Sequence, residues 1–169
     1  MSSFKPVRRL LLATAVASAL AAGCGFHIRG DTPLPMKTLA IVGGEDSPLV
    51  INLKRTLRGN AHVNLVDKPE AAEATLYIIN NQNDKSILTL SGGGRVREFQ
   101  LTQKVTFRVA DTKGAEWLPQ SEINVRRDFS FNDSEALAKE GEERLLIADM
   151  QSDVVQQLVR RLSLAKHPA

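Results

Sequence analysis

The sequence predicts an α+β domain in which two helices pack on one face of a four- to five-stranded mixed, mostly antiparallel sheet. Three observations carry this prediction: a strand–helix–strand pattern over residues 38–66, a series of strands over 75–129, and a long amphipathic helix over 134–163. Alternation of apolar and polar residues indicates strands with one buried face, whereas apolar residues three and four apart indicate helices. A layer of helices on a layer of sheet buries both apolar faces.

The first pattern begins with the apolar run 38–42, which predicts a buried strand ended by a glycine pair. Ser47, followed by a proline, is placed to cap a helix that ends at Gly59. A second short strand follows over 63–66. This close succession of elements favours a right-handed crossover that sets the two strands parallel.

The next strands are expected to be antiparallel. Residues 75–80 and 87–90 are predicted strands, separated by a bulge or loose stretch, and the glycines of 92–94 make the following turn. Residues 98–109 alternate most clearly, with apolar side chains at odd positions interrupted only by Gln103. This segment therefore predicts a long strand with one buried and one solvated face.

The last strand is predicted over 122–129, with Ile123 and Val125 facing the core. Arg127 shares their phase, so either a bulge rotates it outward or it points toward the apolar side. Asn132 or Asp133 is expected to cap the final helix, with Glu135 placed to close a capping box. The core stripe of this helix is Ile147, Met150, Val154, Leu158 and Leu162.

The chain begins with a leader typical of bacterial lipoproteins. Three cations precede the apolar run 10–22, small residues follow, and Cys24 is the only cysteine. Thirteen apolar residues are too few to span a bilayer, which takes about 20. We therefore expect a signal peptide over 1–23, with the Cys24 thiol as the site of lipidation. The alternative is a structural cysteine that happens to fall at this position.

The expected organisation after the leader is a lipidated linker over 24–36, a single domain over 37–165 and a tail over 166–169. Gly25, rather than an aspartate, follows the cysteine, as in lipoproteins sent to the outer membrane. The leader holds three of the basic residues, so residues 24–169 carry 19 basic and 19 acidic side chains. No global field attracts polyanions, and nucleic acid is not an expected partner.

The sequence predicts neither a metal site nor an enzyme. His27, His62 and His167 keep no metal-ligand spacing with a cysteine or carboxylate. No nucleophile, base and orienting group can be assembled, so no catalytic residue and no cofactor is expected apart from the lipid on Cys24. The acidic residues at 140, 142 and 143 are expected to be a solvated helix face. Trp117 is expected to cover an edge of the core.

Five basic residues fall near predicted ends of the sheet. They are Arg95 and Arg97 beside the glycine turn, Arg126 and Arg127 late in the last strand, and Lys139 near the start of the long helix. Each alone is most simply a surface charge. If they converge, they could receive an anionic group such as phosphate, because arginine offers bidentate contacts and lysine a point charge.

Five strings are distinctive in their order and spacing: CGFHIRG at 24–30, GRVREFQL at 94–101, RDFSF at 127–131, ALAKE at 136–140 and QQLVRRL at 156–162. Together they resemble the LptE (RlpB) family of lipopolysaccharide-assembly lipoproteins. The resemblance implies two helices on a mostly antiparallel sheet, as derived above. It also implies an outer-membrane lipoprotein that plugs the LptD β-barrel, and the two proteins together insert lipopolysaccharide into the outer leaflet.

The resemblance further implies that a helix lysine, here Lys139, and a basic residue near the hairpin turn, here Arg95, contact lipopolysaccharide. Arg97 and Arg127 complete the candidate lipopolysaccharide-binding set. The alternative function is a periplasm-facing lipoprotein module that binds a small or amphiphilic ligand, which predicts a closed apolar pocket with a few convergent polar groups.

Overall fold

The computed structural model describes residues 33–167. The predicted signal peptide and the lipidation site Cys24 lie outside the described residues. The chain divides into two compact units, Met1–Gly30 and Asp31–Ala169. Every residue of the described hydrophobic core lies between Leu34 and Ala165. The second unit therefore has a hydrophobic core of its own, and a domain with its own core can in principle fold alone.

The elements follow in the order β1 (Thr38–Val42), α2 (Pro48–Arg58), β2 (Asn64–Leu65), β3 (Ala74–Leu90), β4 (Val96–Ala110), β5 (Glu116–Ser130) and α3 (Ala136–Ser163). Single 3-10 turns, Pro69–Ala71 and Asp133–Glu135, precede β3 and α3. The strands form one sheet of order β2-β1-β3-β4-β5. β1 is parallel to both neighbours and the remaining pairs are antiparallel. The predicted α+β fold is confirmed.

The strand–helix–strand unit forms as the sequence predicts. The Ser47 hydroxyl accepts a hydrogen bond from the Val50 amide (3.3 Å) and caps α2. Four apolar residues of α2, namely Leu49, Val50, Leu53 and Leu57, are fully buried, and a fifth, Ile51, is exposed. The parallel pairing of β1 with β2 is confirmed, and β1 also pairs in parallel with β3.

β3 extends beyond the end of its partner β1. Their pairing ends with Val42 of β1 opposite Tyr77 of β3. Beyond that point β3 is an edge strand and pairs only with β4. The sequence predicts two strands here, separated by a bulge or loose stretch. β3 is one continuous strand with a bulge at Ile78–Asn80. β5 also starts earlier than predicted, at Glu116, which places Trp117 in the core with only 4% of its surface exposed.

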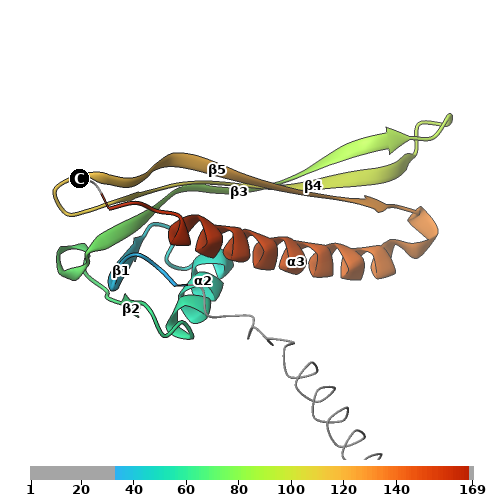
Figure 1. Ribbon diagram of the computed structural model, residues 1–169. Helices are drawn as coiled ribbons and strands as arrows, with labels where there is room; N and C mark the ends of the chain where they lie inside the picture. The colour runs from blue at the N-terminus through green and yellow to red at the C-terminus, as the bar shows by residue number, and fades with distance from the viewer. Residues whose placement is uncertain (1–32, 168–169) are drawn as a thin grey trace, which may run out of the picture. The chain divides into compact units, whose positions relative to one another are not determined.

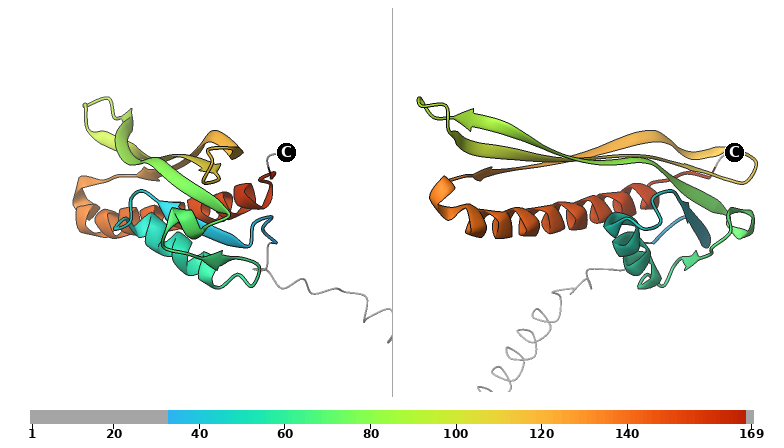
Figure 2. Two further views of the ribbon diagram at one scale, coloured as in Figure 1. Left: turned by 90° about the vertical axis from the view of Figure 1, so that its left-hand side faces the viewer. Right: turned by 180° about the vertical axis from the view of Figure 1, so that it is seen from behind.

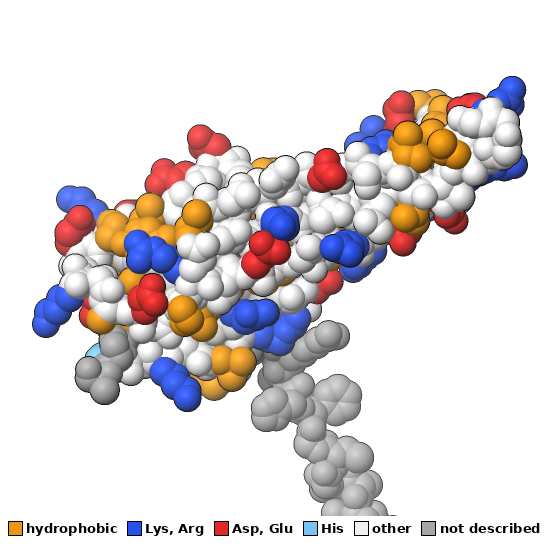
Figure 3. All heavy atoms as spheres, turned by 90° about the horizontal axis from the view of Figure 1, so that it is seen from above, with side chains coloured by type: hydrophobic (Ala, Val, Ile, Leu, Met, Phe, Trp, Pro, Cys, Tyr) orange, Lys and Arg blue, Asp and Glu red, His pale blue; other side chains and the backbone are white. Residues whose placement is uncertain are grey.

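α3 lies along one face of β3–β5, and α2 lies on the same side at the end nearer β1 and β2 (Figures 1 and 2). The odd residues of β4 from Leu101 to Val109 are buried beneath this layer. α3 contributes Met150, Val154, Leu158 and Leu162 as predicted, and Ile147 is partly buried. The opposite face carries no helix and shows charges of both signs, with hydrophobic side chains gathered toward both ends (Figure 3).

Gly141 lies inside the first half of α3, where a Cβ atom would meet nothing within 4 Å. Glycine in a helix interior costs about 0.5–1 kcal/mol relative to alanine. Gly141→Ala is therefore expected to raise the free energy of unfolding of residues 31–169 by about that amount. Urea denaturation measures the change, and a loss of stability would show that the helix needs glycine here.

Candidate anion-binding site at the distal end of the sheet

The β3–β4 turn, the end of β5 and the start of α3 meet at the distal end of the sheet, far from β1 and β2 (Figure 1). A polar cavity of about 290 Å³ lies there. Its lining residues are Ser91, Arg95, Val96, Arg97, Phe131, Asn132, Asp133 and Ser134. Two of the four predicted lipopolysaccharide-binding residues, Arg95 and Arg97, thus share one cavity.

The turn that presents the two arginines is held by its own backbone. The Ser91 amide donates to the Arg95 carbonyl (2.8 Å), and the Gly94 amide donates to the Ser91 carbonyl (2.9 Å). Gly94 has φ +76°, a conformation that side-chain-bearing residues rarely adopt. The Phe131 amide donates to the Arg97 carbonyl (2.7 Å), which fixes the end of β5 against the hairpin.

The other wall of the cavity is the 3-10 turn Asp133–Glu135. Asn132 caps this turn, because its side-chain oxygen accepts from the Ser134 amide (3.3 Å). The sequence predicts that Asn132 or Asp133 caps the long α-helix directly. In the structure Asn132 caps the 3-10 turn instead, and α3 begins at Ala136. The charged residues that line the cavity are two arginines and one aspartate, Asp133.

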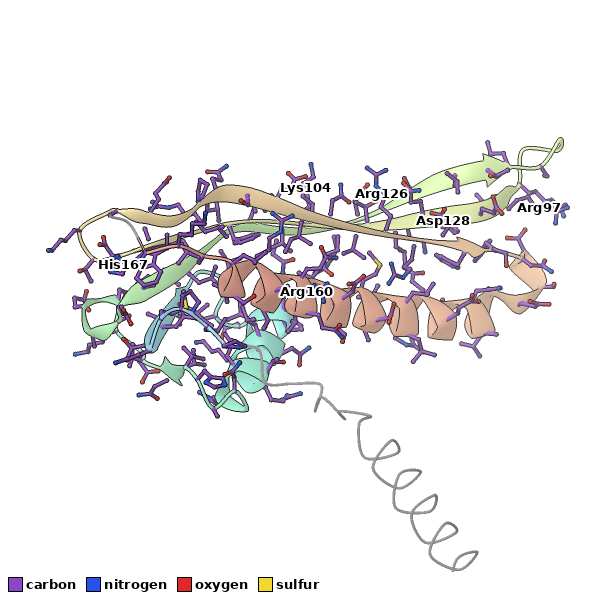
Figure 4. The ribbon with its side chains drawn as sticks, in the orientation of Figure 1. Arg97, Lys104, Arg126, Asp128, Arg160 and His167 are labelled. Carbon is purple, nitrogen blue, oxygen red and sulfur yellow. The ribbon has the colours of Figure 1, made fainter. Side chains whose placement is uncertain are left out.

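The arginine side chains are exposed, and Arg97 lies at the outer end of the sheet beside the β5–α3 connection (Figure 4). A guanidinium group offers paired N–H donors that match the oxygens of phosphate or carboxylate. Two such groups on one turn can bind an anion locally on a chain with balanced charge. The Asp133 carboxylate repels anions close to it. It therefore favours ligands that carry a hydrogen-bond donor as well as an anionic group.

Lys139 lies close to this cavity but not in its lining. Its ammonium group donates to the Ser130 hydroxyl (3.1 Å) and forms an ion pair with Glu142 (2.7 Å). Only 15% of the side chain is exposed. Lys139 must therefore exchange Glu142 for any anionic ligand that it contacts.

The sequence left open whether a bulge rotates Arg127 outward or whether it points toward the apolar side. The structure decides between these two alternatives. Arg127 pairs with Leu101 without a bulge, so it faces α3. Its guanidinium forms ion pairs with Asp149 (2.9 Å) and Asp153 (3.3 Å). Hydrogen bonding to Asp149 is the main reason that the pKa of Arg127 is raised. Arg127 stays charged and links β5 to α3, away from the distal cavity.

Arg127→Met is expected to lower the free energy of unfolding by no more than about 1 kcal/mol, because the ion pairs are partly exposed. Methionine keeps the aliphatic contacts of the side chain. Lipopolysaccharide binding is expected to stay within twofold of the unmodified chain. Denaturation and a lipopolysaccharide pull-down measure both effects, and a large loss of binding with stability retained would place Arg127 in the ligand site.

A contact that sequence reasoning missed joins β3 to α3. Lys85 pairs with Glu143 (2.6 Å), and its ammonium lies 4.3 Å from the ring centroid of Phe99. Phe99 in turn stacks on Phe129 and meets Phe131 edge-on. Glu143 is only 23% exposed, so the expectation of a fully solvated acidic face is wrong for this residue. No short-range pattern could reveal the pair, because its members lie 58 positions apart.

Within residues 33–167, no group of three His, Cys, Asp or Glu side chains is arranged to hold a metal ion. In the same part of the chain, neither helix combines the length and apolar character needed to cross a membrane. The Trp117 ring packs in the core with its centroid 4.7 Å from that of His167.

Comparison with known proteins finds a protein family whose model matches this chain. Residues 36–162 match the family model described as LptE, Lipopolysaccharide-assembly. A relative from Photorhabdus laumondii named LPS-assembly lipoprotein LptE is 32% identical over 158 residues, covering 92% of this chain and 85% of its own. A relative of the same name from Yersinia enterocolitica is 33% identical over 166 residues, covering 96% and 78%.

Two solved structures are also similar. Lipoprotein B from Nitrosomonas europaea is 37% identical with a TM-score of 0.72, covering 82% of this chain and 90% of its own. Rare lipoprotein B from Shewanella oneidensis is 27% identical with a TM-score of 0.64, covering 74% and 92%. The family description and the names of the first two relatives specify assembly rather than a reaction. This agrees with the expectation that the chain is not an enzyme.

Proposed function

Because the chain belongs to the LptE family of lipopolysaccharide-assembly lipoproteins, we propose that it is an outer-membrane lipoprotein that plugs the LptD β-barrel. The two proteins together insert lipopolysaccharide into the outer leaflet. The chain itself works by fitting and binding, without catalysis. Acyl chains on Cys24 anchor it, with residues 1–23 removed, 24–36 as linker, 37–165 as the working domain and 166–169 as a tail.

The observation that carries this proposal is the uncovered face of the sheet. Along β4 and β5 this face bears polar side chains in regular alternation, among them Lys104 paired with Glu122 (3.5 Å) and Gln100 bonded to Asp128 (3.0 Å). Lys104 and Arg126 point away from α3 (Figure 4). The lumen wall of a membrane β-barrel is polar, so a polar sheet face with charges of both signs suits contact with that wall.

We assign lipopolysaccharide contact to the distal site. Arg95 and Arg97 bind phosphate in the cavity, and Lys139 adds a third cation when it releases Glu142. Arg127 supports the domain by joining β5 to α3. Because residues 24–169 carry equal numbers of basic and acidic side chains, binding stays local, and its salt dependence reports a small number of charge contacts.

Detergent extraction followed by affinity purification of the full chain tests the barrel partnership. We expect a much larger β-barrel protein to co-purify in about equal amount, and mass spectrometry identifies it. Cys24→Ala is the control for anchoring, and it is expected to release the chain from the outer-membrane fraction. Recovery of the unmodified lipoprotein alone, from cells in which it reaches the outer membrane, would contradict the proposal.

The alternative of a binding module for a small periplasmic ligand receives less support. The larger cavities among residues 33–167, of about 310 and 380 Å³, are lined mainly by polar and charged residues, whereas pockets for small ligands are mostly apolar.

A further inference from the structure

A second cavity lies between α3 and the distal half of the sheet. Its volume is about 190 Å³, and its apolar walls are Leu101 of β4 and Ile147 and Met150 of α3. The other six lining residues are polar: Gln103, Lys85, Glu143, Asn83, Asp84 and Thr102. None of these side chains belongs to the distal anion site, so this cavity is separate from it.

Gln103 is the polar residue that interrupts the apolar face of β4, and only 1% of its surface is exposed. Its amide nitrogen donates to the Asn81 side-chain oxygen (3.2 Å). Its own oxygen, Oε1, is buried with no hydrogen-bond partner among the described residues. Buried acceptors are nearly always satisfied, and one left unpaired lowers stability. The terminal torsion of glutamine is soft, so Oε1 can turn toward a donor in the cavity.

Water is a poor occupant of the apolar part of this cavity. An ordered water needs two to four polar partners, and Leu101, Ile147 and Met150 offer none. The space equals the volume of about six water molecules in the liquid, so a short aliphatic chain fits it. The way in is along β3, which has no neighbouring strand beyond Tyr77.

Two charged residues of the lining are partly exposed. Lys85 and Glu143 form an ion pair at 2.6 Å, and their side chains are 37% and 23% exposed. Lys85 also lies against the Phe99 ring, which holds the ammonium in place. An occupant with an apolar body and a polar end would therefore meet matching surroundings at both ends.

We propose that this cavity binds a single aliphatic chain that carries a hydroxyl or amide N–H donor. The methylene groups pack against Leu101, Ile147 and Met150, and the donor bonds to the Gln103 oxygen. Lys85 and Glu143 bracket the polar end. The inference goes beyond the proposed function, because binding needs neither the barrel nor the lipid anchor.

The test uses residues 31–169 in two NMR titrations, one with methyl 3-hydroxyoctanoate and one with methyl octanoate. We expect the hydroxylated ester to shift the methyl signals of Ile147 and Met150 and the side-chain amide of Gln103. It should bind about tenfold more tightly than the ester without the hydroxyl. The absence of shifts at Ile147 and Met150 with both esters would overturn the proposal.

Two variants separate the parts of the proposal. Gln103→Met keeps the length of the side chain and removes the acceptor, so it should still bind both esters but lose the preference for the hydroxyl. Ile147→Trp fills the cavity and should abolish both titrations. If the tryptophan variant fails to fold, the methionine variant still decides: an unchanged tenfold preference there would refute the role of Gln103.

Discussion

Reversal of both distal arginines, Arg95→Glu together with Arg97→Glu, is expected to weaken lipopolysaccharide binding by residues 31–169 at least about tenfold. A hydrogen bond to a charged group contributes about 1.5–3 kcal/mol, and exposure and salt reduce that value at this site. Each 1.4 kcal/mol corresponds to a factor of ten in affinity. The new carboxylates, joined to Asp133, would also repel phosphate. Surface plasmon resonance on immobilised lipopolysaccharide measures the change.

The matched control is Arg160→Glu with Arg161→Glu, which alters net charge equally at the other end of α3 (Figure 4). This control should leave binding within twofold, since neither residue lies in the distal cavity. Equal losses for the two double variants would mean that net charge, and not the distal site, governs affinity. Raising the salt concentration should weaken the unmodified chain more than the Arg95/Arg97 variant.

Phe107→Ala is expected to lower the free energy of unfolding by about 3–5 kcal/mol, the range seen when a buried aromatic ring is removed. Phe107 has no exposed surface and lies on β4, between β3 and β5, on the face that the helices cover. The free energy of unfolding of native proteins is about 5–15 kcal/mol, so this substitution would remove a large part of the stability. Urea denaturation gives the value.

Thr106→Ala is the matched control for Phe107→Ala, because Thr106 is the next residue on β4 and faces the other side of the sheet. It should cost less than about 1 kcal/mol. Losses of similar size at the two positions would contradict a sheet with one buried and one solvated face.

The parts of the fold that depend on short-range pattern were predictable. The parallel crossover, the cap at Ser47 and the core stripe of α3 all follow from spacing and residue type. The continuous course of β3 was not predictable, because residues 80–84 are polar on both faces and look like a loop. They remain a strand because β4 pairs with them along their whole length, which is a long-range property.

The candidate site was predictable only in part. Arg95 and Arg97 were candidates from the sequence, but whether the basic residues converge could not be read from it. The wall formed by Asn132–Ser134 depends on how β5 returns to the hairpin. The ion pairs of Arg127 and of Lys85 link strands to a helix many residues away, and no local signal reveals such partners. The interruption at Gln103 was visible in the alternation, but its unpaired oxygen was not.

Site-specific photo-crosslinking in intact cells tests the central claim most directly. The crosslinking residue replaces Thr102 or Asn124, which lie on the uncovered face of β4 and β5, or Val154, which has no exposed surface. The account predicts that Thr102 and Asn124 form covalent adducts with a large β-barrel protein and that Val154 forms none. A chain that reaches the outer membrane but gives no barrel adduct from either sheet position would contradict it.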